Sequence, residues 1–336
     1  MQKLGVTAPY PIRVILTLII YASNIFFVVF LLFFPRDVMS AARNGLILWF
    51  NNVLPALLPF IVTVNLLNAL GFVRYISRWA EPFMAVVFKL PGAGGFALIT
   101  GLLSGYPMGA KTVSDLRRAG EITTKEAQRL LAFCNNAGPL FIVGVVGVGL
   151  IGDSSAGYVL WAGHVAAALT IGVLTRWWGQ AAGPCSRSSG KPKDNNTQLV
   201  HMSDIPNIGK VMGEAVKNAM EALLVVGGLI IFFSVVVRCV TILTGDMPFM
   251  TEGMLTGIFE ITSGVRVLAD TSYGVISPAR LAAIGGVIGF GGFSVHAQAL
   301  HFASGTGIKA GAYIFFKALN GIFAAGISWA IWMIFI

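Results

Sequence analysis

The chain has 336 residues, of which 56% are hydrophobic and only 11% are charged. A soluble globular domain carries roughly a quarter charged residues, so this composition excludes a protein with a largely water-facing surface. The formal net charge is +9, but the basic residues lie between long apolar runs, so we do not expect nucleic-acid binding. The three cysteines, Cys134, Cys185 and Cys239, are too scattered for a disulfide framework or a thiolate metal site.

Several apolar stretches are long enough to cross a bilayer, which takes roughly 20 residues. The first, residues 14–34, precedes Pro35 and Arg36 rather than a small-residue cleavage site, so we expect a retained helix and not a signal peptide. The further spans are expected at residues 46–70, 130–151, 157–178, 220–243 and 311–336.

Shorter apolar segments lie between these spans, at residues 82–90, 94–110, 253–268 and 281–299. We expect the glycine-rich segments 94–110 and 281–299 to be re-entrant hairpins, which membranes tolerate only where protein or a wet cavity surrounds them. The predicted fold class is therefore an all-α integral membrane protein. We expect an inverted-repeat transporter bundle with two re-entrant helical hairpins and broken helices.

A polar stretch at residues 179–218 divides the chain. Its apolar content is too low for a core, so we expect it to be a flexible cytoplasmic linker. Residues 52–58 are similar to residues 218–224, and residues 101–107 fall in the same place as residues 289–295, so a duplicated unit is indicated. The predicted divisions are an N-terminal membrane helix and loop (1–45), a first repeat with hairpin 1 (46–178), the linker (179–218) and a second repeat with hairpin 2 (219–336).

The basic residues predict the orientation of the chain in the membrane. With the N-terminus in the cytoplasm, most of the 23 Lys and Arg residues fall on the cytoplasmic side, as the positive-inside rule requires. The same threading makes hairpin 1 enter from the cytoplasm and hairpin 2 from the opposite face. The two units are then inverted, which is the architecture of many secondary transporters.

The first candidate site is the expected tip of hairpin 1. Gly105 and Pro107 interrupt a helix and leave backbone groups without partners, which together with the helix dipole suit an anionic solute. Alternatively, this segment is a tight turn, and Lys111 extends to the cytoplasmic interface. The substrate-binding candidates here are Ser104, Gly105, Tyr106 and Lys111.

The second candidate is the pair Asn135 and Asn136, inside an otherwise apolar span. Gly138 and Pro139 follow, so we expect an unwound or kinked helix at membrane depth. An asparagine amide both donates and accepts hydrogen bonds, as a polar solute or a coordinated ion requires. The alternative is hydrogen bonding between helices, which is common in membrane bundles.

The third candidate is Glu260 with Thr262 and Ser263, in the apolar segment 253–268. An intramembrane carboxylate is costly and indicates a function such as proton transfer or cation binding. In the alternative interpretation, Glu260 pairs with Arg266 at an interface.

The fourth candidate is the expected tip of hairpin 2, with Ser294, His296 and Gln298. A protonated His296 could bind an anion or take part in proton coupling, whereas a neutral one would only be hydrogen-bonded. Lys317, deep in the last span, is either a counter-charge for the substrate or the partner of a carboxylate.

Other chemistry is not indicated. No Gly-rich loop ends in Gly-Lys-Ser or Gly-Lys-Thr, which disfavours an ATP-driven pump. Neither a metal-ligand spacing nor a hydrolase-like order of Ser, His and Asp occurs, so we expect no enzyme, no metal and no cofactor. A coupling ion, either H⁺ or Na⁺, is left open.

Three motifs resemble one family of membrane proteins. They are Gly101-Leu-Leu-Ser-Gly-Tyr-Pro-Met-Gly-Ala-Lys111, Glu126-Ala-Gln-Arg-Leu-Leu131 and Phe133-Cys-Asn-Asn-Ala-Gly-Pro-Leu-Phe-Ile142. The chain resembles the sporulation integral membrane proteins of the YlbJ/SpoVV type, and residues 91–92, 259–264 and 291–298 fit the same pattern. These proteins belong to the Gate, or nucleoside-recognition, group, which is similar to the core of concentrative nucleoside transporters.

The resemblance implies an inverted-repeat transporter in a membrane around the forespore, with dipicolinate as its cargo. Dipicolinate is a flat aromatic dianion that suits helix dipoles, amides and basic groups. A nucleoside or nucleobase carrier is the first alternative, although residues 101–110 contain no acid that could bind a ribose. A non-transporting scaffold that works with a partner is the second. A homo-oligomer is expected only by analogy with nucleoside carriers.

Overall fold

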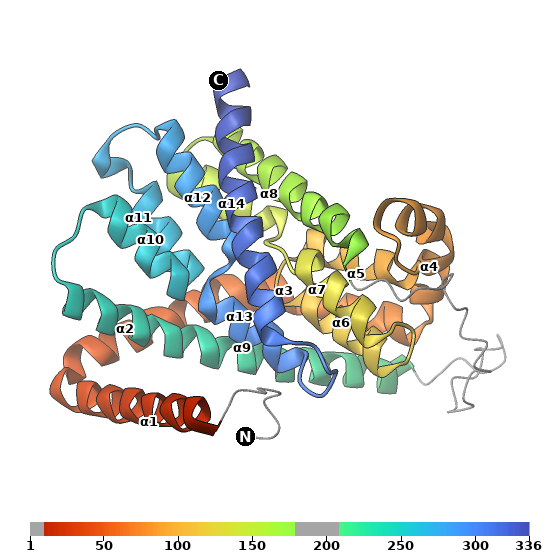
Figure 1. Cartoon of the computed structure of the whole chain (residues 1–336), viewed down its shortest axis with the longest axis horizontal. Helices are drawn as coiled ribbons and strands as arrows, with labels where there is room; N and C mark the ends of the chain where they lie inside the picture. The colour runs from red at the N-terminus through yellow and green to blue at the C-terminus, as the bar shows by residue number, and fades with distance from the viewer. Residues whose placement is uncertain (1–9, 179–207, 336) are drawn as a thin grey trace.

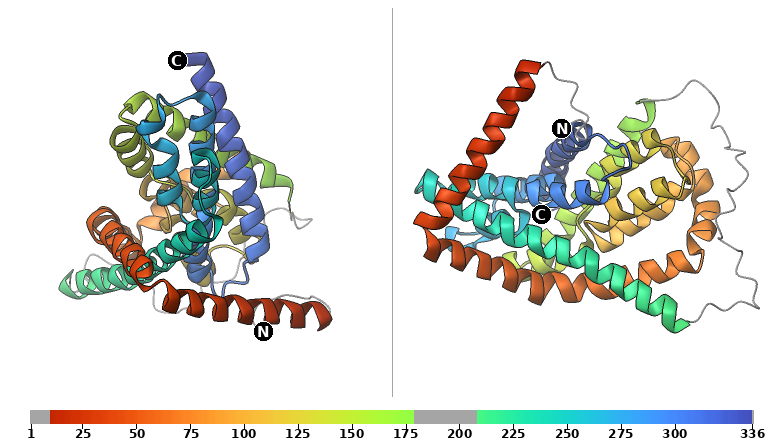
Figure 2. Two further views of the ribbon diagram at one scale, coloured as in Figure 1. Left: turned by 90° about the vertical axis from the view of Figure 1, so that its left-hand side faces the viewer. Right: turned by 90° about the horizontal axis from the view of Figure 1, so that it is seen from below.

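The computed structural model describes residues 10–178 and 208–335, and all regular elements in these two ranges are helical. The predicted fold class, an all-helical integral membrane bundle with broken helices, is confirmed. Figure 1 shows the bundle with α14 nearly upright and α9 running across it, and Figure 2 shows α1 projecting from the edge of the bundle.

The first half contains α-helices interrupted by π-helical segments of 5 to 12 residues. In chain order its elements are α1 (Tyr10–Phe33), α2 (Pro35–Leu48), η2 (Trp49–Val53), α3 (Leu54–Ala69), α4 (Phe72–Phe83), η3 (Met84–Phe88), α5 (Ala93–Ser104), α6 (Met108–Arg118), α7 (Thr124–Cys134), η4 (Leu140–Ile151), α8 (Ser154–Leu174) and η5 (Thr175–Trp177).

The second half starts with the longest helix of the described chain. Its elements are α9 (Ile208–Thr244), α10 (Phe249–Phe259), α11 (Ile261–Ala269), η6 (Thr271–Tyr273), α12 (Pro278–Phe290), α13 (Gly292–Phe302) and α14 (Ala310–Phe335). The beginning of α9 corrects the predicted linker: residues 208–218 are helical, and the rest of that stretch lies outside the described residues.

Within the described ranges, four helical segments are long and apolar enough to cross a membrane, or up to six if each of two bent pairs counts as one span. One bent pair is α1 with α2, which meet at 102°, and the other is α4 and η3 with α5, which meet at 87°. The expected span 46–70 is corrected: these residues are divided among α2, η2 and α3, and the apolar part, Leu57–Leu67, is shorter than a membrane span.

The two halves meet along a pair of antiparallel helices, α2–α3 and α9, which lie side by side in Figure 2. At one end Arg238 pairs with Asp37, with Nη2 and Oδ1 2.5 Å apart. In the middle, Trp49 donates to the carbonyl of Leu223 over 3.0 Å, and further along Asn65 donates to that of Ala215. These three contacts show that α2–α3 and α9 run antiparallel along the length of their contact.

Two pairs of short helices fold back on themselves as hairpins. In hairpin 1, made of α5 and α6, a Cβ on Gly101 would lie 3.3 Å from the Cα of Gly109. In hairpin 2, made of α10 and α11, a Cβ on Gly264 would lie 2.2 Å from the Cα of Gly257. Glycine therefore lets the two arms of each hairpin approach to backbone distance.

The position of hairpin 2 corrects the sequence prediction, which placed it at residues 281–299. Those residues lie in α12 and α13, which form one span, Pro278–Phe302, with a break at Gly291. The chain reverses instead at Glu260, whose extended backbone (φ −141°, ψ 115°) separates α10 from α11. The prediction was wrong because it used glycine content as the hairpin signal. The break expected within residues 130–151 is confirmed, since α7 ends at Cys134 and η4 begins at Leu140.

A buried arginine holds the loop that follows hairpin 2. The Arg280 guanidinium donates to the carbonyls of Leu268, Asp270 and Gly274 at 2.8–3.1 Å and lies over the ring of Phe249. We expect Arg280→Met to leave these carbonyls without donors and to lower the free energy of unfolding by about 3 kcal/mol. A lower melting temperature of the purified protein in nanodiscs checks this.

The control for this experiment is Arg43→Met on α2, because Arg43 is exposed. It should change the free energy of unfolding by less than about 0.5 kcal/mol. Equal melting temperatures for the Arg280 and Arg43 variants would contradict the clamping role of Arg280.

Candidate functional site

The unwound segments of the two broken helices lie against the tips of the two hairpins. A Cβ on Gly105, at the tip of hairpin 1, would lie 2.6 Å from the backbone nitrogen of Gly138 in the first break. A Cβ on Gly292, at the second break, would lie 3.3 Å from the backbone nitrogen of Ile261 at the tip of hairpin 2. Each half therefore gathers its non-helical backbone in one place, surrounded by other parts of the protein.

Asn135 is the centre of the polar contacts at the first break, and no part of it is exposed. Its side-chain Nδ2 donates to the Tyr313 hydroxyl over 2.8 Å, and its Oδ1 accepts from the backbone N–H of Ala110 at 3.4 Å. Its backbone carbonyl accepts from Nζ of Lys317 at 2.9 Å. Asn135 thus connects hairpin 1, the first break and α14.

Lys317 places a fully buried amino group beside this break. Among the described residues, the carbonyl of Asn135 accepts its hydrogen bond, and none of the ion pairs involves Lys317. The sequence left two interpretations of Lys317, a counter-charge for the substrate or the partner of a carboxylate. The second is not found among the described residues. An ammonium at this depth without a counter-charge is costly, and an anionic ligand would relieve that cost.

The second break contributes His296, which is 2% exposed. Its Nε2 lies 2.8 Å from the carbonyl of Phe290, and because a carbonyl only accepts, Nε2 carries the proton. Its Nδ1 has no partner among the described residues. The ring packs edge-on against Tyr313, with ring centroids 5.3 Å apart.

Tyr106 joins hairpin 1 to the second half of the chain. Its hydroxyl donates to the carbonyl of Ile288 over 3.4 Å, and its ring lies 3.7 Å from the place where a Cβ on Gly291 would be. We define the central cluster as Tyr106, Asn135, His296, Tyr313 and Lys317. Residues from both halves thus surround one buried, partly unsatisfied polar centre.

Glu260 has a structural role at the tip of hairpin 2. Its carboxylate accepts from the backbone N–H groups of Thr262 and Ser263, at 3.0 and 2.7 Å, and so caps the first turn of α11. The predicted alternative, an ion pair with Arg266, does not occur among the described contacts. Glu260 is 2% exposed, and the hydrogen bonds of its side chain described here do not involve a residue of the central cluster.

Four other candidates make local hydrogen bonds outside the central cluster. Ser104 donates to the carbonyl of Thr100, one helical turn back. Asn136 donates to the carbonyl of Phe133 at 2.6 Å, and its Oδ1 has no partner among the described residues. Ser294 and Gln298 bond to each other over 3.4 Å within α13, rather than at a hairpin tip as predicted.

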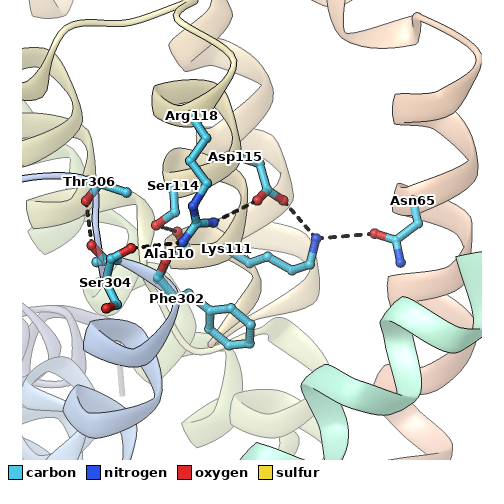
Figure 3. Close-up of polar contacts among 10 residues, drawn as sticks. Asn65, Ala110, Lys111, Ser114, Asp115, Arg118, Phe302, Ser304 and Thr306 are labelled. Carbon is cyan, nitrogen blue, oxygen red and sulfur yellow. Dashed lines mark hydrogen bonds and ion pairs between the residues drawn. The ribbon is translucent and has the colours of Figure 1, made fainter.

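Lys111 belongs to a polar network around α6, and none of its contacts there involves a residue of the central cluster (Figure 3). Its Nζ pairs with Asp115 at 2.8 Å and donates to the side chain of Asn65 on α3. Arg118 also pairs with Asp115 and reaches the carbonyls of Phe302 and Ser304. This network holds the outer arm of hairpin 1 between α3 and the end of α13, so Lys111 positions the hairpin and does not snorkel freely.

Sequence reasoning missed Tyr313 and His164. The backbone N–H of Ala137 donates to Nε2 of His164 at 3.1 Å, so this imidazole satisfies part of the first break. A histidine inside an apolar span is itself a signal of function and could have been found. Tyr313 gave no such signal, because an aromatic residue near a helix end is common in membranes. In the described ranges, no group of His, Cys, Asp and Glu side chains could hold a metal ion.

Comparison with known proteins identifies the family. Residues 50–154 match the family model of the Gate domain, described as nucleoside recognition. The sporulation integral membrane protein YlbJ of Bacillus subtilis (strain 168) is 33% identical over 339 aligned residues, which cover 94% of this chain and 83% of YlbJ. The chain belongs to the YlbJ family.

For a YlbJ family member, the name of the relative supports both an integral membrane location and a link to sporulation. The matched Gate region spans hairpin 1 and the first break, where Tyr106 and Asn135 lie. No solved structure matches the chain.

Proposed function

We propose that this YlbJ family member is a secondary transporter of a small organic anion, and not an enzyme. The observation that carries the proposal is Lys317, a fully buried amino group that donates to one backbone carbonyl and has no ion-pair partner among the described residues. An anion is the ligand that such a group favours. The broken helices around it supply further donors, as they do in secondary transporters.

Dipicolinate is the substrate that we propose within this class, in a membrane around the forespore. Support comes from the sporulation relative and from the chemistry of a planar dianion beside Lys317, the Asn135 amide and the rings of His296 and Tyr313. We propose a cytoplasmic N-terminus, movement of one repeat against the other, and coupling to H⁺ or Na⁺.

A nucleoside or nucleobase carrier is the second candidate, favoured by the Gate model over residues 50–154. Against it stands hairpin 1, which presents no acid between Gly101 and Ala110 that could bind a ribose. Uptake experiments separate the two candidates directly.

The test is uptake of labelled dipicolinate and labelled uridine into proteoliposomes, with and without gradients of Na⁺ and protons. Saturable uptake of dipicolinate supports the proposal, and its gradient dependence names the coupling ion. Uptake of uridine alone would place the protein among nucleoside carriers. Uptake of neither solute, beside a control carrier that works in the same vesicles, would favour a scaffold that acts with a partner.

We expect Asn135→Ala to lower dipicolinate uptake by about tenfold or more, because a fully buried amide that joins Tyr313 and Ala110 is lost from the central cluster. Initial rates in proteoliposomes measure the change. The matched control is Asn65→Ala, because the Asn65 amide also donates across to the second half, at Ala215, but lies outside the cluster. Equal uptake by both variants, normalised to folded protein, would contradict a role for Asn135 in transport.

A further inference from the structure

A groove of about 400 Å³ opens between α2, α9 and hairpin 2. Its walls carry the charged residues Asp37, Arg238 and Arg266, and the hydroxyls of Thr262 and Ser263. This volume lies in the range of about 300–1,000 Å³ that small-molecule sites occupy. The groove is distinct from the central cluster, none of whose residues lines it.

The charge of the groove is unbalanced toward positive. Asp37 is paired with Arg238 at 2.5 Å, so these two charges largely compensate each other. Arg266 is exposed, and its side chain takes part in none of the ion pairs or hydrogen bonds among the described residues. Its guanidinium, with five donors in a planar fork, is suited to bind a carboxylate through two parallel hydrogen bonds.

One face of α11 presents these groups together. Thr262 and Arg266 are one helical turn apart, so they lie on the same face, whereas Gly264 and Leu268 face the packed side against α10. Thr262 and Arg266 also line a second cavity of about 310 Å³, whose other walls are mainly apolar and include Leu48. A polar and an apolar compartment therefore share Arg266.

We propose that this groove captures the carboxylate of an aromatic or otherwise apolar organic acid before the acid reaches the central cluster. Arg266 binds the carboxylate, the hydroxyls of Thr262 and Ser263 add hydrogen bonds, and the apolar body lies in the second cavity. This inference rests on the proposed transport of an organic anion and names where that anion first binds.

Hairpin 2 lies between the groove and the second break. Thr262 and Ser263 line the groove, while the adjacent Ile261 contacts Gly292 at the break next to His296. An acid bound in the groove is therefore separated from the central cluster by the tip of this hairpin. Movement of hairpin 2 connects the two sites, as lids do in other carriers and enzymes.

The test measures equilibrium binding of labelled dipicolinate to the full-length protein in nanodiscs of zwitterionic lipid. We expect Arg266→Gln to raise the dissociation constant at least about tenfold, since it removes the charge and the two-point contact. The dissociation constant of Arg266→Lys should lie between those of the wild type and Arg266→Gln, because an ammonium keeps the positive charge but lacks the two-point geometry of a guanidinium. Arg43→Gln is the matched control, an exposed arginine on α2 outside both cavities, and should bind as the wild type does.

Unchanged binding by folded Arg266→Gln protein would overturn the groove as an anion site. Uptake in proteoliposomes tests the proposed function separately. Absence of dipicolinate uptake by the wild type contradicts transport, whatever the binding result. Where transport occurs, Arg266→Gln should raise the half-saturation concentration about tenfold and leave the maximal rate unchanged.

An anionic phospholipid has the same chemistry, a charge attached to an apolar body, and the assay separates it from a soluble acid. The wild type is therefore also measured in nanodiscs that contain phosphatidylglycerol. Dipicolinate binding that persists there supports the proposal. Its loss, together with phosphatidylglycerol that co-purifies with the wild type but not with Arg266→Gln, would assign the groove to lipid and overturn the proposal.

Discussion

Lys317→Met is expected to abolish dipicolinate uptake, with a decrease of more than about a hundredfold, while the protein stays folded. The amino group of Lys317 is fully buried and donates to the carbonyl of Asn135, so it is the positive charge that an entering anion meets in the central cluster. Losing a buried charge pair costs about 3–5 kcal/mol, which corresponds to more than two orders of magnitude. Methionine fills similar space without the charge. Initial uptake rates in proteoliposomes give the measurement.

The control is Lys309→Met, at the residue directly before the same helix. The side chain of Lys309 is exposed, and only its backbone bonds to Gln128. This variant should transport at the wild-type rate. If Lys317→Met protein transported dipicolinate normally at equal reconstitution, the assignment of Lys317 as the counter-charge of the substrate would be wrong.

Gly101→Ala is expected to prevent hairpin 1 from packing on the first break and so to destabilise the whole bundle. A Cβ at this position would lie 1.7 Å from the carbonyl oxygen of Cys134 and 3.3 Å from the Cα of Gly109, and because both are backbone atoms, no side chain can move aside. Overpacking in a well-packed interior costs about 1–3 kcal/mol and sometimes more, and here we expect the upper end or beyond. The melting temperature in nanodiscs and the yield of folded protein report the loss.

Gly326→Ala in α14 is the matched control, because no atom of the described residues lies within 4 Å of a Cβ there. Alanine favours a helix over glycine by about 0.5–1 kcal/mol, so this variant should melt at the same or a higher temperature. A melting temperature for Gly101→Ala within the error of the wild type would contradict the close packing of hairpin 1 against Cys134 as the reason for this glycine.

The break in the first half was predictable because several residues close together in the sequence disfavour a helix there. Asn135, Asn136, Gly138 and Pro139 each disfavour a continuous helix, by competing hydrogen bonds, by backbone freedom or by the missing N–H. The structure ends α7 at Cys134 for the same local reasons. Hairpin 1, with Gly105 and Pro107 at its turn, was predictable in the same way.

Hairpin 2 was not predictable from local composition. Residues 285–292 contain more glycine than residues 258–264, yet the helix continues through most of them, because those glycines pack closely on α14. A Cβ on Gly289 would lie 2.8 Å from Gly321, for example. Glycine thus served helix packing in one place and chain reversal in the other, and the sequence pattern does not distinguish the two.

The sequence by itself determined the membrane location, the helical class and the break after Cys134, since these depend on the transfer free energy of apolar residues and on the conformational preferences of neighbours. Only the tertiary structure decided that Lys317 meets the carbonyl of Asn135, 182 positions away, and that Arg266 lines a groove and has no ion-pair partner among the described residues. Such contacts join residues distant in the chain, and their geometry follows from how whole helices pack rather than from any local pattern.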